Sequence, residues 1–245
     1  MTKKIYDKIA NSYLRTDLSL TKKYVAAPTF IKLVGRTKNK RVIDFGCGSG
    51  YSTRLMTGAS LLVGVDSSLK QINLARKIEK IEKRGIIYSQ ADINKSTFLK
   101  FKEFDKVTAM YLLHYASTKE ELYIICKNIA RSLKSGGKFI AINSNPDFPE
   151  QTNRKYGITA TFEGNLVEGA RRKVVYLLFN EEICSFNTYF WKKETYEGAL
   201  QKAGFRNIKW YLPIVSQEGL DVLGKGFWKE LLEKPFICGL TATKS

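Results

Sequence analysis

The segment RVIDFGCGSG, residues 41–50, joins an apolar run to three closely spaced glycines. They form a GxGxG loop, and such a loop after a strand lets the backbone approach a nucleotide-like ligand. A dinucleotide loop reads GxGxxG, but Tyr51 occupies its last position, and this ring is too large for the close packing of helix and strand. The Asp44 carboxylate would also repel a pyrophosphate. The loop therefore favours a ligand that carries a positive charge and no phosphate.

Two further acids end the strands expected after the loop. Asp66 closes LLVGVD about 20 residues beyond the first glycine, where a carboxylate can accept both ribose hydroxyl protons. Asp92 stands in QAD, where it could meet an adenine amino group. S-adenosylmethionine (SAM) fits this set, because it combines an adenosine with a sulfonium and an ammonium that Asp44 could face. Each acid alone could merely cap the next helix or turn, but the ordered set favours SAM over a dinucleotide.

His114, the only histidine, follows the fourth expected strand and precedes Tyr115. An imidazole titrates near neutral pH, so His114 could act as a general base or as a hydrogen-bond partner of a methyl acceptor. The alternative is a polar residue that caps the next helix. We expect His114 and Tyr115 to contact the substrate.

Polar and aromatic residues after the fifth expected strand are further substrate candidates. Asn143 and Asn145 could pair with the edge of a heterocycle, although an Asx turn before Pro146 would also explain Asn145. In SFNTYFW, alternation separates the two faces of a strand. We expect one face to be core and the other, with Tyr189 and Trp191, to stack on a planar substrate.

The elements that must position these residues alternate between strand and helix. Short connections between such elements predict a parallel sheet with helices on both faces, whose ligands bind at the carboxyl ends of the strands. Strands are expected at 41–46, 61–66, 85–92, 104–113, 138–143, 206–212 and 236–244, and helices at 4–14, 22–34, 51–58, 69–83, 119–137, 193–205 and 224–234. Residues 146–193 interrupt the alternation with short β-like runs and predict an inserted antiparallel flap.

The composition fits one folded domain over 1–245. The chain has 44% apolar and 12% aromatic residues, enough for a core. It has no apolar run of the roughly 18 residues that a membrane span needs, and its first residues lack the apolar core of a signal peptide. Its four cysteines form no CxxC pair. We therefore expect a cytoplasmic protein without a metal site. The net charge of +18 is spread over scattered lysines, which favours a solvated surface over a nucleic-acid interface.

The motifs VIDFGCGSG, LLVGVD, SQADI, FDKVTAMYLLHYA and ARSLKSGGKFIAIN resemble those of class I SAM-dependent methyltransferases over about 40–145. The resemblance implies a Rossmann-like, mostly parallel sheet of seven strands in the order 3-2-1-4-5-7-6, with the seventh antiparallel. It also implies that an N-terminal helical lid, 1–36, covers the site with Tyr6 and Tyr13. We expect the cofactor to contact Tyr13, Asp44, Gly46, Cys47, Gly48, Asp66, Ser67, Ala91, Asp92, Ile93 and Met110.

A narrower resemblance involves YDKIANSY at the start of the chain, NSNP after the fifth strand and the tail from TYFWKKETYEGALQKAGF onward. These segments are similar to bacterial small-molecule methyltransferases of the toxoflavin-pathway N-methyltransferase type, which methylates a fused pyrimidine-triazine ring. We expect the insertion at 146–193 to form a substrate cap on the one domain. Tyr6 and Tyr13 lie seven residues apart, on one helix face, so either could instead pack against the core.

The sequence leaves three functions open. The first is transfer of a methyl group from SAM, with S-adenosylhomocysteine as product, to N or O of a small heteroaromatic metabolite, with catalysis by Tyr13 and His114. The second is methylation of rRNA or tRNA through the basic surface, and the third is a SAM-binding module without catalysis. We expect the protein to bind a small molecule and not a membrane. We expect it to be a monomer or a homodimer.

Overall fold

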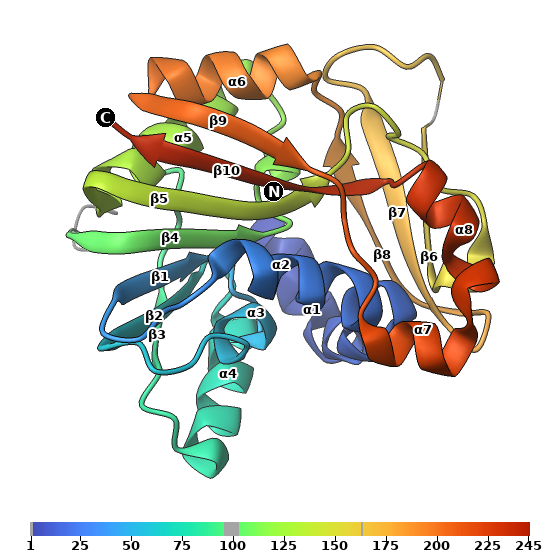
Figure 1. Cartoon of the computed structure of the whole chain (residues 1–245), viewed down its shortest axis with the longest axis horizontal. Helices are drawn as coiled ribbons and strands as arrows, with labels where there is room; N and C mark the ends of the chain where they lie inside the picture. Colours follow the sequence, from blue (N-terminus) through green and yellow to red (C-terminus); the bar gives the residue numbers. More distant parts are fainter. Residues whose placement is uncertain (1, 96–102, 163) are drawn as a thin grey trace.

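A computed structural model describes residues 2–95, 103–162 and 164–245; residue 1 of the expected lid and residue 163 of the expected cap lie outside them. Its main body is a seven-stranded sheet in the order β3-β2-β1-β4-β5-β10-β9 (Figure 1). The strands are β1 (Arg41–Phe45), β2 (Leu61–Asp66), β3 (Ile87–Gln90), β4 (Phe104–Met110), β5 (Leu133–Ser144), β9 (Phe205–Tyr211) and β10 (Ile237–Lys244). Strands β1 to β5 are parallel, and β10 is antiparallel to β5 and β9. The predicted order 3-2-1-4-5-7-6 is confirmed.

Helices cover both faces of this sheet (Figure 1). Successive side chains of a strand point to opposite faces, so Val42 packs with Phe30 and Ile72 on one face, while Ile43 packs with Leu122 and Leu200 on the other. Burial on both faces explains the continuous apolar runs of the parallel strands. The α-helices are α1 (Thr2–Arg15), α2 (Ala27–Val34), α3 (Tyr51–Arg54), α4 (Leu69–Glu82), α5 (Lys119–Ser132), α6 (Lys193–Lys202), α7 (Gln217–Leu223) and α8 (Lys225–Glu233).

A second, antiparallel sheet is inserted between β5 and α6. It has the order β6-β7-β8, with β6 (Ile158–Phe162), β7 (Arg171–Leu178) and β8 (Glu181–Tyr189). Figure 1 shows it beside α1 and α8, beyond the carboxyl ends of the parallel strands. The predicted antiparallel insertion after the fifth strand is confirmed, and we call β6–β8 the flap.

Several boundaries differ from the expected ones: α3 ends at Arg54, β4 ends at Met110 and β3 covers only Ile87–Gln90. The helix expected over 119–137 ends at Ser132, and β5 begins at Leu133. The two glycines that suggested a helix stop lie within β5, where the register against β4 shifts and Gly136 has a φ of 72°. The expected helix 22–34 begins with a π-helical turn, η2 (Lys22–Ala26), before α2.

Within the described ranges, no helix is both long and apolar enough to cross a membrane. Over the same ranges, no three His, Cys, Asp or Glu side chains cluster in a way that could hold a metal ion.

Candidate functional site

A cavity of about 280 Å³ lies at the carboxyl ends of β1, β2 and β4, and we call it the cofactor cavity. Sequence-predicted residues on four different segments meet there. Its lining comprises Tyr6, Tyr13, Phe45, Gly46, Gly48, Val65, Asp66, Ser67, Ala91, Asp92, Ile93, Asn94, Met110, Tyr111, Leu112, Tyr115, Glu121 and Ile125. The structure thus brings together Tyr6, Tyr13, Gly46, Gly48, Asp66, Ser67, Ala91, Asp92, Ile93, Met110 and Tyr115 from the residues expected to bind cofactor or substrate.

Asp66 links the glycine loop to the start of α4. Its Oδ2 accepts from the Gly48 N–H at 2.9 Å, and its Oδ1 accepts from the Ser68 N–H at 2.8 Å. Burial raises the pKa of Asp66, while these backbone N–H groups oppose the rise. Each carboxylate oxygen can accept more than one hydrogen bond, so Asp66 can hold the loop and still receive hydroxyl groups from a ligand.

Asp44 does not line the cofactor cavity, contrary to the expected contact with an ammonium group. Its side chain is fully buried, and the carboxylate accepts hydrogen bonds from Ser52 at 2.6 Å, Thr53 at 2.7 Å and Thr108 at 2.8 Å. Burial raises the pKa of Asp44 to about 6, although the three hydroxyl groups oppose the rise. Asp44 therefore ties β1 to α3 and β4 below the glycine loop, which is a structural role.

Cys47 also lies outside the cofactor cavity, although it belongs to the glycine loop. Its side chain is buried against β2, where a Cβ atom on Gly64 would come within 3.0 Å of the thiol sulfur. Burial raises the pKa of the thiol well above its ordinary value, so Cys47 is neutral. The Cys47 side chain therefore faces the core and not the cofactor cavity.

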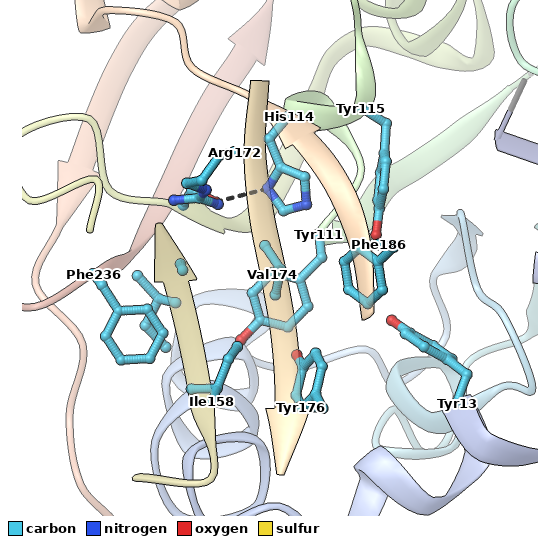
Figure 2. A pocket seen from close by; sticks show the side chains of 13 residues that line it. Tyr13, Tyr111, His114, Tyr115, Ile158, Arg172, Val174, Tyr176, Phe186 and Phe236 are labelled. Atoms are coloured by element: carbon cyan, nitrogen blue, oxygen red, sulfur yellow. Dashed lines mark hydrogen bonds between the residues drawn. The ribbon is translucent and has the colours of Figure 1, made fainter. Parts of the chain in front are cut away.

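A second, much smaller cavity adjoins the first, and we call it the acceptor pocket (Figure 2). It shares three tyrosines with the cofactor cavity, and the flap supplies much of its remaining wall. Its volume of about 20 Å³ has room for one water molecule, so a larger ligand must displace part of the lining. The lining comprises Tyr13, Tyr111, His114, Tyr115, Ser144, Ile158, Ala160, Arg172, Val174, Tyr176, Phe186, Phe236 and Ile237.

Aromatic rings from α1, the β4–α5 connection and the flap meet where the two cavities join. The Tyr6 ring lies 4.9 Å from that of Tyr13, 5.8 Å from Tyr115 and 5.8 Å from Phe186, between ring centroids. The hydroxyl groups of Tyr6 and Tyr115 are hydrogen-bonded. Burial raises the pKa of Tyr6, Tyr13 and Tyr115, so these phenols are neutral hydrogen-bonding groups at physiological pH.

His114 is buried in the wall of the acceptor pocket and forms part of a polar chain with Ser144 and Arg172. Ser144 Oγ lies 2.9 Å from His114 Nδ1, and Arg172 Nη2 donates to the same Oγ. An arginine can only donate, so the arrangement that satisfies all three groups has Ser144 donating to Nδ1. The ring proton of His114 is then on Nε2.

The ionisation of His114 agrees with this assignment. Burial and the charge of Arg172 lower the pKa of His114 well below 6.5, against a smaller opposing effect of the Asn143 side chain. A neutral ring whose Nδ1 already accepts a proton from Ser144 is a poor general base. The geometry therefore favours hydrogen bonding by Nε2–H over proton abstraction.

Asn143 and Asn145 do not line either cavity. Asn145 donates to the Pro235 carbonyl at 2.7 Å and accepts from the Asp147 N–H at 3.1 Å, which is the Asx turn that sequence offered as the alternative. Asn143 is fully buried, and its Nδ2 donates to the Ser144 carbonyl at 3.4 Å. The expected direct substrate contacts of the two asparagines are replaced by structural ones.

The face of β8 that lies toward the site is not the one expected. Trp191, just after the strand, is buried in the core and donates from Nε1 to the Ala116 carbonyl at 2.9 Å, and Tyr189 packs against the same core. Phe186 lines the acceptor pocket, and Thr188 on the same face accepts from Arg172. Tyr189 and Trp191 are therefore not placed to stack on a substrate.

Helix α1 is held over both cavities by two polar anchors. Asp7 accepts from Ser68 Oγ at 2.6 Å at the beginning of α4. The buried Lys22 pairs with Asp17 at 2.5 Å, and its ammonium lies 5.1 Å from the Tyr13 ring centroid and 4.6 Å from that of Tyr51. These contacts fix the end of α1 beside the glycine loop.

Sequence reasoning missed four non-aromatic polar lining residues, which are Arg172 and Ser144 in the acceptor pocket and Asn94 and Glu121 in the cofactor cavity. One signal could have found Arg172. In RRKVVYLL, strand alternation puts Arg172 on the face of Val174 and Tyr176, which is an unusual place for a cation. Ser144 carried no comparable signal, because its role depends on β5 meeting β7.

Comparison with known proteins agrees with the fold and the cofactor cavity. Residues 43–141 match a methyltransferase domain. N-demethylindolmycin N-methyltransferase of Streptomyces griseus is 24% identical over 68% of this chain and 70% of its own length. The ubiquinone/menaquinone biosynthesis C-methyltransferase UbiE of Vibrio parahaemolyticus is 25% identical over 72% of this chain and 68% of its own. Other curated relatives match over about half of their length.

Solved structures share the fold across nearly the whole chain. A SAM-dependent methyltransferase structure from Listeria monocytogenes, whose assignment is provisional, has a TM-score of 0.62 at 23% identity and covers 90% of this chain and 98% of its own. A SAM-dependent methyltransferase from Mesorhizobium loti has a TM-score of 0.61 at 18% identity and covers 93% of this chain and 99% of its own. Residues 43–141 therefore match a methyltransferase domain, and the described chain has the sheet order and fold of SAM-dependent methyltransferase structures.

Proposed function

We propose that the enzyme transfers the methyl group of SAM to a nitrogen or oxygen atom of a small, planar, heteroaromatic metabolite. The observation that carries this proposal is the acceptor pocket, which is small, lined mostly by aromatic or apolar side chains, and shares Tyr13, Tyr111 and Tyr115 with the cofactor cavity. Small-molecule sites commonly combine such walls with a few polar groups. The small volume of the pocket also disfavours an RNA substrate.

The relatives support a small acceptor. The names of two of them refer to N-demethylindolmycin and to ubiquinone or menaquinone biosynthesis. The finer similarity to toxoflavin-type enzymes adds a fused planar ring as the acceptor. Rings of this kind would fit between Tyr115, Phe186 and Tyr176 once the pocket widens.

Residues on the cofactor side would bind SAM by its separate parts. Asp66 would receive the ribose hydroxyl groups, and Asp92 with Ile93 would meet the adenine, while Gly46 and Gly48 leave space for the backbone to approach. SAM supplies an activated methyl group on a sulfonium. Transfer of the methyl group would turn the sulfonium into the neutral thioether of S-adenosylhomocysteine, and the proton of an N–H or O–H acceptor would be released to water.

The protein's part in this reaction is positioning and exclusion of water. In-line displacement requires donor and acceptor to be held in contact, and the leaving thioether needs no proton. Tyr13 and Tyr115 lie at the junction of the two cavities, and His114 would orient the acceptor through Nε2–H. Helix α1, within the lid of residues 1–36, and the flap, within the cap of residues 146–193, would close the site.

The test combines binding and turnover. SAM and S-adenosylhomocysteine should each raise the melting temperature, and a panel of heteroaromatic amines, phenols and fused-ring enols should include compounds that yield S-adenosylhomocysteine. Transcribed tRNA and rRNA fragments serve as the competing substrates. Methyl incorporation into RNA, with none into the small molecules, would reject a small-molecule acceptor. Absence of any shift with SAM would reject methyl transfer itself.

A further inference from the structure

Arg172 places a positive charge inside the acceptor pocket. The residue is 4% exposed and lies on β7 of the flap. Burial lowers its pKa to about 10, so the guanidinium remains charged at neutral pH. Among residues 2–95, 103–162 and 164–245, no carboxylate forms an ion pair with it. A buried charge without a counter-charge is costly in a folded protein, so its position calls for a partner.

The hydrogen bonds of Arg172 leave part of its donor capacity unused. Nε donates to Thr188 Oγ1 at 3.1 Å, Nη1 donates to the Pro149 carbonyl at 2.7 Å, and Nη2 donates to Ser144 Oγ. A guanidinium has five N–H groups. One N–H on each terminal nitrogen therefore remains for a ligand, and these two nitrogens form the fork that binds carboxylate or another anionic oxygen.

The neighbours of Arg172 in the pocket provide no negative charge. The titratable groups that face it are His114 and the tyrosines Tyr111, Tyr115, Tyr176 and Tyr196. Burial raises the pKa of each of these tyrosines and lowers that of His114, so all five are neutral near pH 7. A ligand is the remaining source of a counter-charge within the pocket.

His114 adds a second donor beside the guanidinium. Figure 2 shows its ring between Arg172 and Tyr115, with the nitrogen that is not bound to Ser144 on the side of Phe186. The chain from Arg172 through Ser144 keeps the proton on this Nε2. The polar corner of the pocket therefore presents N–H donors and one positive charge, which is the complement of an anionic oxygen.

From this geometry we propose that the methyl acceptor carries an anionic oxygen, a carboxylate or a ring oxyanion, which Arg172 binds in the acceptor pocket. This proposal rests on the proposed small-molecule methyl transfer and specifies its substrate class. The ring of such an acceptor would lie among the aromatic side chains, with its charged edge toward Arg172 and His114. A neutral acceptor of the same shape would leave the guanidinium unpaired and would bind more weakly.

The experiment compares matched anionic and neutral probes on the full chain saturated with S-adenosylhomocysteine. Benzoate against benzamide tests a carboxylate, and 4-nitrophenol, whose absorbance reports its own ionisation, tests a ring oxyanion. Titration calorimetry gives the two affinities of the first pair. Benzoate should bind about tenfold or more tightly than benzamide, or bound 4-nitrophenol should ionise at a lower pH than the free compound. Either result supports the proposal and identifies the kind of oxyanion.

Variants separate ligand binding from a purely structural role of Arg172. In Arg172→Met the preference for the anionic probe should disappear, whereas Arg172→Lys should keep part of it. Arg171→Met, which removes an exposed charge from the same strand, should leave the preference unchanged. If Arg172 only fastened the flap to β5, its variants would lower the melting temperature while the ratio of the two affinities stayed constant.

Two results would overturn the proposal. In the first, wild-type protein binds benzoate and benzamide with equal affinity, and bound 4-nitrophenol ionises at the same pH as the free compound. In the second, none of the anionic probes binds. Neither depends on whether Arg172→Met folds. Affinity for S-adenosylhomocysteine is measured on the same samples. Loss of that affinity would count against the proposed function, whereas its retention without an anion preference would reject this inference alone.

Discussion

Asp66 joins the glycine loop to the start of α4, and we predict that its carboxylate also binds the ribose of SAM. Asp66→Ala removes a predicted ribose contact and two backbone hydrogen bonds, so affinity for SAM should fall by about 1–3 kcal/mol. Calorimetric titration measures this change. Asp105→Ala is the matched control, since Asp105 also accepts a backbone N–H, from Arg41, but lies at the amino end of β4. Equal losses in the two variants would assign Asp66 to folding only.

Asp44 should make stability depend on pH. Its pKa is about 6 in the folded protein and 3.8 in an unfolded chain. Below pH 3.8 the Asp44 carboxyl is protonated in both the folded and the unfolded state, so its burial does not lower the free energy of unfolding. Between pH 3.8 and 6 the carboxyl ionises in the unfolded chain but stays protonated in the folded protein, so the free energy of unfolding falls as the pH rises. The total loss is at most about 3 kcal/mol. Urea unfolding from pH 4 to 7 should therefore show a decline in wild type that Asp44→Asn reduces, and parallel curves would contradict the assignment.

His114 is expected to act on the acceptor and not on the cofactor. His114→Ala removes one donor from the acceptor pocket, so kcat/KM for the acceptor should fall by about tenfold or more while affinity for S-adenosylhomocysteine stays the same. Steady-state kinetics and calorimetry give the two values. A fall in cofactor affinity that matches the loss in rate would show a general structural effect.

At the scale of elements, α1 is the part whose attachment should control access to both cavities. Asp7 fastens it to Ser68 at the beginning of α4. Asp7→Ala should therefore speed dissociation of S-adenosylhomocysteine by several fold, as followed by stopped-flow fluorescence, because a looser lid opens more often. Lys8→Ala, at an exposed neighbouring position, is the control. Identical rates for both variants would mean that α1 does not limit release.

The strands and the cofactor side of the site could be predicted from the sequence because each part is local. A buried strand, a glycine loop and a strand-final acid appear together in short segments such as 41–50 and 61–66. The burial of Asp44 could not be predicted, because the sequence gives its spacing but not the three hydroxyl groups that surround it. No local feature of the sequence distinguishes a carboxylate that is buried beneath a loop from one that faces a ligand cavity.

The acceptor side could not be predicted in the same way. Alternation separated Phe186 from Tyr189 correctly, but the face that turns inward depends on how the flap meets α1. Phe186 packs 5.8 Å from Tyr6 and 5.9 Å from Tyr13, between ring centroids, and these partners are more than 170 residues away in sequence. Contacts of this kind are decided by the tertiary fold.

At the scale of the whole molecule, the net charge of +18 should assist an anionic acceptor. A positive field raises the rate of encounter with an anion, and salt weakens it as the screening length falls from about 30 Å at 0.01 M to about 8 Å at 0.15 M. Over this range kcat/KM for an anionic acceptor should drop by several fold, with kcat unchanged. Steady-state kinetics at each salt concentration measure both. A flat kcat/KM would mean that the surface charge does not guide the substrate.

The flap supplies Ile158, Ala160, Arg172, Val174, Tyr176 and Phe186 to the acceptor pocket and none of the lining of the cofactor cavity. Under the proposed function, different stretches of the gene would encode the binding of the acceptor and of the methyl donor. Mutations confined to one short insertion should then alter which molecule is methylated while the methyl donor continues to bind as before. Such an enzyme can acquire new acceptors in evolution, or in a directed-evolution library, without rebuilding its catalytic domain.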